Sequence, residues 1–181
     1  MVVGMSDYYD AFEISPVPAP GPDAVTPEPF RGIYGMPVFA TIPTNDMATT
    51  IDFWTRGLGF FELFSAPDAI THLRRWAFQD VLIIPAASDP AGPPTMSVSF
   101  ACVLGEVDSI AENCNALRPA CADGPRDTPW NTRDVTVITP ENAHVIFTAA
   151  KPYDPTSEEA SNLEALGIVG PAGNADNGEH V

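Results

Sequence analysis

The side chains best suited to acid–base chemistry gather around one predicted strand. His72, Arg74 and Trp76 alternate along this strand, so all three side chains point to the same face. Asp80 follows a few residues later and adds a further group able to accept or donate a proton. A metal held between His72 and His144 is an alternative, although no carboxylate stands at a matching register. We favour ordinary surface or core roles for both histidines.

The common catalytic and ligand-binding motifs are missing from the sequence. It contains no Ser-His-Asp order, no phosphate-binding loop, no G-x-G-x-x-G and no H-E-x-x-H. The three cysteines, Cys102, Cys114 and Cys121, include no C-x-x-C pair. This pattern predicts buried thiols in a reducing compartment, with no disulfide framework and no zinc site. We therefore expect a cytoplasmic protein without a committed catalytic apparatus.

The charge of the chain argues against two classes of partner. The sequence has 24 acidic and 8 basic side chains, which give a formal net charge of −16. An acidic protein without a basic cluster is repelled by nucleic-acid phosphates and by anionic lipid. No apolar run approaches the roughly 20 residues that cross a bilayer. We therefore predict no nucleic-acid partner and no membrane partner.

The two ends of the chain differ from the middle. Residues 1–30 form an acidic, proline-rich arm with one short helix candidate at 6–12, and the prolines favour an extended path. Residues 152–181 begin with a capping signal before a predicted helix at 157–166 and end in a polar run typical of disorder. Neither end supplies a strand to the domain between them.

The middle, residues 31–151, repeats one plan of β-α-β-β-β in modules 33–87 and 95–151. In the first module, the spacing of apolar residues predicts strands at 36–42, 60–65, 71–77 and 81–85 and a helix that starts after Asp46 and ends at Gly59. In the second module, it predicts strands at 96–103, 120–122, 133–139 and 144–149 and a helix through 107–117. The predicted fold is α+β, with the paired modules forming a curved mixed sheet around a concave cleft and the helices outside.

Three segments carry a resemblance to a known family. Asp46–Phe60 (DMATTIDFWTRGLGF) is similar to a "D…ai-FY…-LGF" segment, Pro129–Asp134 (PWNTRD) to a "PWG-RE" turn, and Thr139–Asn142 (TPEN) to an Asp-Pro-Asp-Gly turn. Over residues 33–151 the chain thus resembles the vicinal oxygen chelate superfamily, which includes glyoxalase I, bleomycin-resistance proteins and extradiol dioxygenases.

The resemblance also implies where a divalent metal would be held. By register, the four ligand positions fall at Phe39, Ile84, Ser99 and Ile146, and their neighbours offer no ligands either. Such side chains cannot hold a metal that needs His, Glu, Asp or Cys donors. The chain therefore resembles the metal-free, antibiotic-binding branch, and we expect no cofactor. A metalloenzyme with differently placed ligands is the alternative.

Seven residues are predicted to bind a ligand in the cleft. Trp76 and Trp130 are aromatic walls, Phe61 is a third aromatic candidate, and Thr41 and Ser99 supply hydroxyl groups. The other two are Phe39 and Arg133; for Arg133 we also consider a structural role as the anchor of its turn to Asp127 or Asp134. Trp54 is predicted to be a core residue instead.

The leading functional hypothesis is non-catalytic binding of a hydrophobic, aromatic small molecule, with antibiotic self-resistance by sequestration as its use. The acidic charge favours a cationic ligand, although solubility explains that charge equally well. Proteins of the family that this chain resembles are commonly homodimers, and we expect this protein to be a homodimer as well. The alternatives are a metal-free isomerase, cyclase or lyase that uses His72, Arg74 or Asp80, a metal-dependent glyoxalase-like or dioxygenase enzyme, and an interaction module that acts through its acidic ends.

Overall fold

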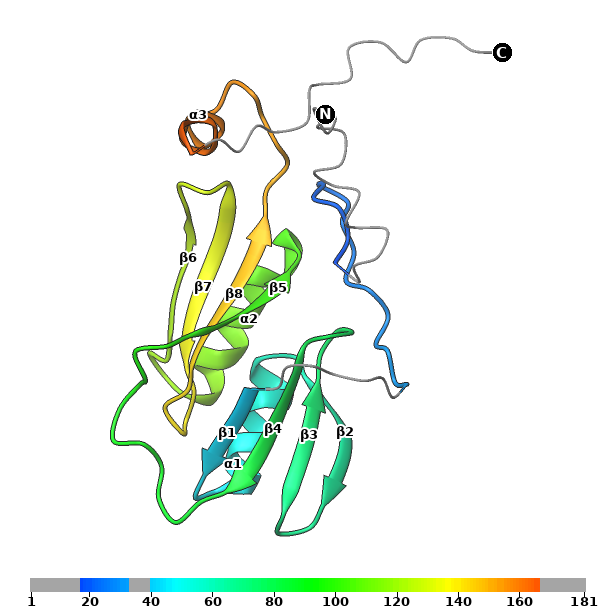
Figure 1. Cartoon of the computed structure of the whole chain (residues 1–181), viewed down its shortest axis with the longest axis vertical. Coiled ribbons are helices and arrows are strands. Elements are labelled where there is room, and N and C mark those ends of the chain that lie inside the picture. The colour runs from blue at the N-terminus through cyan, green and yellow to red at the C-terminus, as the bar shows by residue number, and fades with distance from the viewer. Residues whose placement is uncertain (1–16, 33–39, 167–181) are drawn as a thin grey trace, which may run out of the picture.

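The computed structural model describes residues 17–32 and 40–166 (Figure 1). The helix predicted at 6–12, the start of the strand predicted at 36–42, Phe39 and the polar run after residue 170 lie outside the described residues.

The first module follows the predicted order. Its elements are β1 (Ala40–Thr44), α1 (Met47–Asp52), a π-helical segment η3 (Phe53–Gly57), β2 (Phe61–Ala66), β3 (Ile70–Arg74) and β4 (Asp80–Pro85). Asp46 caps α1, because its Oδ1 accepts a hydrogen bond from the backbone N–H of Thr49 at 3.1 Å. The helical stretch ends before Gly59, whose φ of +74° favours glycine. Strand β3 ends at Arg74, three residues earlier than predicted.

The second module repeats the plan with β5 (Val98–Cys102), α2 (Leu104–Leu117), β6 (Ala122–Asp127), β7 (Thr132–Ile138) and β8 (His144–Ala150), and α3 (Glu158–Ala165) follows it. Helix α2 starts three residues earlier than the predicted 107–117. Glu106 therefore lies inside its first turn, where the side chain accepts from the N–H of Val103 at 3.2 Å. The cap predicted for α3 is confirmed, since Ser157 Oγ accepts from the N–H of Ala160 at 3.0 Å.

Each module forms one four-stranded mixed sheet. The strand orders are β1-β4-β3-β2 and β5-β8-β7-β6. Strands β1 and β4 are parallel, as are β5 and β8, and the other neighbours are antiparallel. Figure 1 shows the sheet of the second module above that of the first, with α2 and α1 behind them. The predicted α+β class, the paired modules and the mixed sheets are confirmed.

One hydrophobic core joins both modules on the helical side of the sheets. The ring of Trp54 lies edge-on to Phe60 at 5.1 Å between centroids, Phe60 lies 5.3 Å from Phe100, and Phe100 lies 5.8 Å from Phe147. Trp54 is 1% exposed, so its predicted core role is confirmed. Because this aromatic chain crosses from one module to the other, the two modules stabilise each other.

The described part of the N-terminal arm, residues 17–32, contains no helix or strand and runs beside the modules (Figure 1). Its end is held by Arg74, whose Nη1 donates to the carbonyl oxygens of Phe30 at 3.1 Å and Gly32 at 2.6 Å. The guanidinium of Arg31 lies 4.6 Å from the ring centre of Phe61. The arm is therefore docked on the domain over these residues.

None of the helices in residues 17–32 and 40–166 combines the length and the apolar character that a bilayer-spanning segment needs.

Candidate functional site

Two of the predicted ligand residues, Thr41 and Ser99, lie on the sheet faces that point away from the helices, one on each sheet. Thr41 pairs with Leu82 across β1 and β4, and Ser99 pairs with Ile146 across β5 and β8. Paired residues share a face, and the alternate positions of these strands are buried in the core. Thr41 and Ser99 are both exposed, as expected for residues of an open sheet face.

The strand pairings show which residues of the two modules occupy equivalent positions, and these differ from the positions inferred from the sequence. Thr41 pairs with Leu82, the third residue of β4, and Ser99 pairs with Ile146, the third residue of β8, so Thr41 and Ser99 occupy equivalent positions. The register inferred from the sequence instead gave Phe39 and Ser99 as ligand positions of the two modules, and Phe39 lies outside the described residues.

The residues at these positions do not fit a divalent metal. The open faces offer hydroxyl groups from Thr41 and Ser99 and aliphatic side chains from Leu82 and Ile146. In the described ranges 17–32 and 40–166, no three His, Cys, Asp or Glu side chains gather as a metal site requires. The side chains of Thr41, Leu82, Ser99 and Ile146 therefore provide no donor set for a divalent metal.

The predicted acid–base residues form a buried ionic cluster. Oδ1 of Asp80 accepts from His72 Nε2 at 2.5 Å and from Arg74 Nε at 2.8 Å. The side chains of Asp80 and Arg74 are 0% and 2% exposed, whereas His72 is partly accessible. If the carboxylate of Asp80 is ionised it can only accept, and the contact then requires the His72 tautomer that carries a proton on Nε2. Through Arg74 the same cluster holds the arm.

Two predicted ligand residues, Phe61 and Trp76, line a cavity of about 400 Å³ beneath the arm, which we call the arm pocket. Its roof includes Pro27 and Pro29 of the arm, and its opposite wall includes Ile110 of α2. The arm pocket thus combines residues that are far apart in the sequence.

Trp76 has an unusual environment in this pocket. Its side chain is 2% exposed, and its Nε1 is the only buried side-chain polar atom without a hydrogen-bond partner among the residues that the structure describes. The guanidinium of Arg75 stacks on the ring at 4.5 Å and is held by Glu106 Oε2 at 2.6 Å and by the carbonyl of Ala101 at 2.8 Å. An unsatisfied buried donor costs about 1–3 kcal/mol.

Sequence reasoning missed Arg75 and Glu106 as residues of this pocket. Their contact joins the end of β3 to the start of α2 across the two modules, so no local pattern could reveal it.

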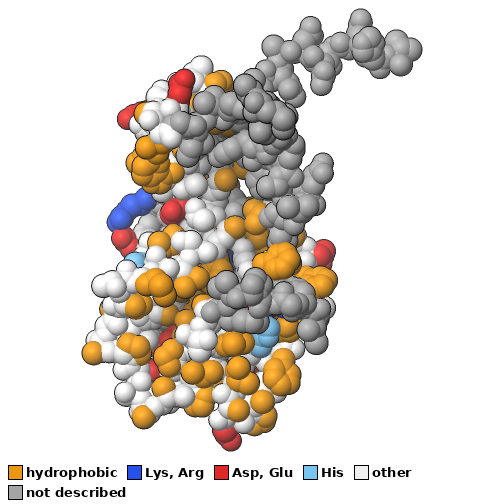
Figure 2. All heavy atoms as spheres, in the orientation of Figure 1, with side chains coloured by type: hydrophobic (Ala, Val, Ile, Leu, Met, Phe, Trp, Pro, Cys, Tyr) orange, Lys and Arg blue, Asp and Glu red, His pale blue; other side chains and the backbone are white. Residues whose placement is uncertain are grey.

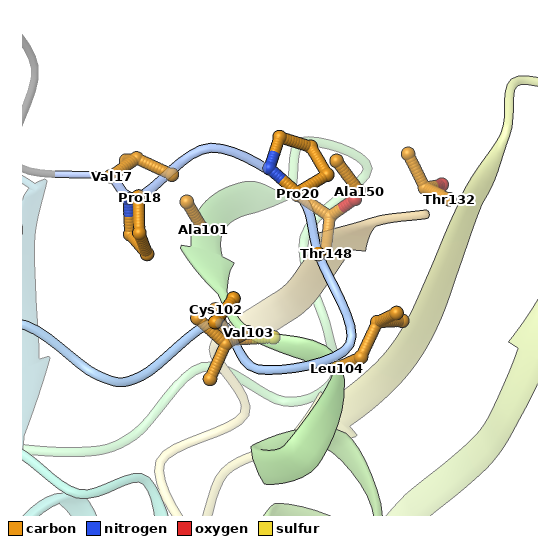
Figure 3. A pocket seen from close by; sticks show the side chains of 12 residues that line it. Val17, Pro18, Pro20, Ala101, Cys102, Val103, Leu104, Thr132, Thr148 and Ala150 are labelled. Carbon is orange, nitrogen blue, oxygen red and sulfur yellow. The ribbon is translucent and has the colours of Figure 1, made fainter. Parts of the chain in front are cut away.

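A smaller cavity of about 200 Å³ lies between the start of the arm and the second module (Figure 3). Pro18 and Pro20 face Ala101 and Cys102 across it. Burial raises the pKa of the Cys102 thiol to about 12. The thiol is therefore protonated at neutral pH and is not an activated nucleophile.

Arg133 does not join the other predicted ligand residues. It lies on the helical side of β7, where its guanidinium contacts Asp108 of α2 at 3.2 Å and Asp127 of β6 at 3.3 Å. These two carboxylates raise the pKa of Arg133 above its usual value. These contacts agree with the structural role considered from the sequence, the anchoring of its turn to Asp127, and the ligand role of Arg133 stays a prediction.

Trp130 also lies apart from the arm pocket. It is 56% exposed in the turn between β6 and β7, where its backbone N–H donates to Thr128 Oγ1 at 3.2 Å. The structure therefore brings together Phe61 and Trp76 among the predicted aromatic residues, and leaves Trp130 at a separate place on the surface.

The fold and the paired modules define the class of protein, and the family comparison agrees. Residues 37–155 match the model of the Glyoxalase/Bleomycin resistance protein/Dioxygenase superfamily. The chain belongs to this superfamily. No curated protein matches the chain.

Solved structures with the same fold include the fosfomycin resistance protein FosX from Listeria monocytogenes, as a mutant complexed with Mn(II) and 1S,2S-dihydroxypropylphosphonic acid. It is 18% identical over 75% of this chain and 99% of its own, with a TM-score of 0.56. FosX from Mesorhizobium loti is 14% identical over 67% and 96%, with a TM-score of 0.53. A glyoxalase/bleomycin resistance protein/dioxygenase from Nocardioides is 16% identical over 85% and 98%, with a TM-score of 0.51. At these identities the likeness shows the fold alone.

Proposed function

We propose that this protein binds a hydrophobic, aromatic small molecule in the arm pocket without transforming it. The observation that carries the proposal is the arm pocket itself, a cavity of about 400 Å³ whose lining includes Phe61 and Trp76, a residue whose buried indole N–H has no hydrogen-bond partner among the described residues. This volume is within the usual range of small-molecule sites, about 300–1,000 Å³. Sequestration of an antibiotic is the use that we propose for this binding.

The chemistry of the arm pocket defines the ligand class. Phe61, Trp76 and the arm prolines offer apolar surface, and the indole N–H of Trp76 offers one hydrogen-bond donor. A planar ring that carries a carbonyl or another acceptor satisfies both. The net charge of −16 adds a long-range attraction for ligands that also carry a positive charge.

Replacement of Trp76 tests this assignment. A screen of planar antibiotics and polyketides against the chelator-treated full chain is expected to yield a ligand that quenches tryptophan fluorescence. Trp76→Phe should then weaken binding by about fivefold or more, because a hydrogen bond of about 1 kcal/mol is lost. The unfolding free energy should change by less than about 1 kcal/mol, since the smaller ring also removes an unsatisfied donor.

Trp130→Phe is the matched control, and it also tests the sequence-based expectation for Trp130. If the ligand is recognised in the arm pocket, its affinity should not change in this variant. Affinity that depends on added Mn²⁺, or a Trp76→Phe variant that binds as well as the original chain, would contradict the proposal. Mass spectrometry should recover the ligand unchanged.

A metal-free enzyme is the second candidate, and the cluster of His72, Arg74 and Asp80 favours it. Asp80 orients His72, which remains partly accessible and so could transfer a proton. If the recovered ligand has changed in mass or structure and His72→Gln abolishes that change, the protein is an enzyme and the binding proposal is wrong.

We also propose that the protein is a homodimer. The open face of the first sheet carries Phe64 at 58% exposure and partly exposed Leu82 and Ile84. Figure 2 shows hydrophobic side chains gathered over the lower half of this view, where the first module lies. A second copy would bury this surface. Phe64→Glu should dissociate the dimer in analytical ultracentrifugation, and a full-length chain that sediments as a monomer at micromolar concentration would refute the proposal.

A further inference from the structure

A separate cavity of about 420 Å³ lies at the junction of the two modules, which we call the linker pocket. Strand β1, the linker between β4 and β5, and the turn before β8 meet there. Its walls are mostly apolar and include Pro43, Pro90 and Met96, whereas Trp54 and Glu141 also line it. The linker pocket shares no lining residue with the arm pocket.

Glu141 is a buried carboxylate with only neutral partners. Its residue is 2% exposed. Oε1 accepts from the indole N–H of Trp54 at 2.8 Å, and Oε2 accepts from the hydroxyl of Thr50 at 3.4 Å. Within residues 17–32 and 40–166, no Lys, Arg or His makes an ion pair with it.

Among the described residues, an ionised Glu141 carboxylate has no ion-pair partner to offset the free-energy cost of its burial. Burial of a charge is costly unless it is paired with an opposite charge and hydrogen-bonded. A glutamine could accept the hydrogen bond of Trp54 equally well, so this bond does not require the charge of Glu141. The long contact from Thr50 leaves Oε2 with capacity for a stronger donor.

We propose that the linker pocket binds an organic ammonium ion with an apolar body. The ammonium group pairs with Glu141, and the body lies against the prolines and Met96. A metal ion is a poor match, because no group of three metal-ligating side chains occurs in the described ranges. This site goes beyond the proposed function, since the arm pocket and its ligand do not depend on it.

Phenethylamine is the probe, and phenethyl alcohol is its neutral counterpart. Isothermal titration of the full-length chain should show one amine per chain, bound roughly tenfold or more tightly than the alcohol. Glu141→Gln should lower the affinity for the amine by about tenfold or more and leave the affinity for the alcohol unchanged, because only the charge is removed. Glu164→Gln on the exposed face of α3 removes the same charge at a distance and should change neither affinity.

A second variant keeps the test decisive if Glu141→Gln does not fold. Gly92 lines the linker pocket, and a Cβ added there meets nothing within 4 Å. Gly92→Phe should therefore fold and abolish amine binding by filling the cavity.

The NMR resonances of the tryptophan indole N–H groups show which pocket the amine occupies. It should shift the Trp54 signal, because Trp54 lines the linker pocket, and leave that of Trp76 in place. Equal affinity for amine and alcohol, binding that survives Gly92→Phe, or the absence of binding would overturn the inference. None of these outcomes affects the Trp76→Phe test of the arm pocket.

Discussion

Trp54→Ala is expected to lower the free energy of unfolding by about 3–5 kcal/mol, the usual cost of removing a large buried side chain. The ring is 1% exposed and contacts Phe60 and Phe100 with centroid distances of 5.1 and 6.4 Å. The truncation also removes the donor that holds Glu141, so a buried carboxylate loses its shortest hydrogen bond. Urea unfolding followed by circular dichroism measures the change.

Trp130→Ala provides the matched control for this substitution. Trp130 is 56% exposed, and an exposed side chain away from such contacts usually contributes less than about 0.5 kcal/mol. Similar losses in the two variants would mean that the aromatic chain through Trp54 does not form the shared core described above.

Asp80→Asn is expected to lower the free energy of unfolding by about 3–5 kcal/mol, because it removes the carboxylate charge from a buried ion pair with Arg74. The shape of the side chain is kept, so the loss reports mainly on charge. Since Arg74 also holds the carbonyls of Phe30 and Gly32, we expect faster hydrogen exchange at the end of the arm.

Asp52→Asn provides the corresponding surface control. Asp52 pairs with Arg56 at 2.9 Å, but the two side chains are 50% and 66% exposed, and such pairs contribute about 0–1 kcal/mol. If both substitutions have effects below about 1 kcal/mol, the cluster around Asp80 is not the buried ion pair that anchors the arm.

Local patterns predicted most of the framework. Period-two alternation located most of the strands, and the spacing around Trp54 located the first helical stretch, because both signals arise from the burial of one face. The strand predicted at 120–122 was misplaced, since β6 runs from Ala122 to Asp127. The same alternation placed Thr41 and Ser99 on the open faces. Arg133 could have been assigned by this rule, since it shares its face with the buried Val135.

The candidate site was less accessible to sequence reasoning. Trp76 was placed at the end of a strand, but β3 stops at Arg74, and Trp76 belongs to the turn in which the N–H of Gln79 donates to its carbonyl at 3.2 Å. Its unpaired indole depends on what packs around it, including the arm. Such an environment is a property of the assembled structure and has no sequence signature.

The sequence by itself determined the repeated β-α-β-β-β plan, the core role of Trp54 and the superfamily, because helix caps, turns and alternating burial depend on neighbours in the chain. The tertiary structure alone decided which distant groups meet. Trp54 and Glu141 belong to two of the motifs that carried the resemblance, yet their hydrogen bond joins residues 87 positions apart. The arm pocket and the linker pocket arise in the same way, because each is formed where segments far apart in the sequence pack together, and local residue preferences do not specify such contacts.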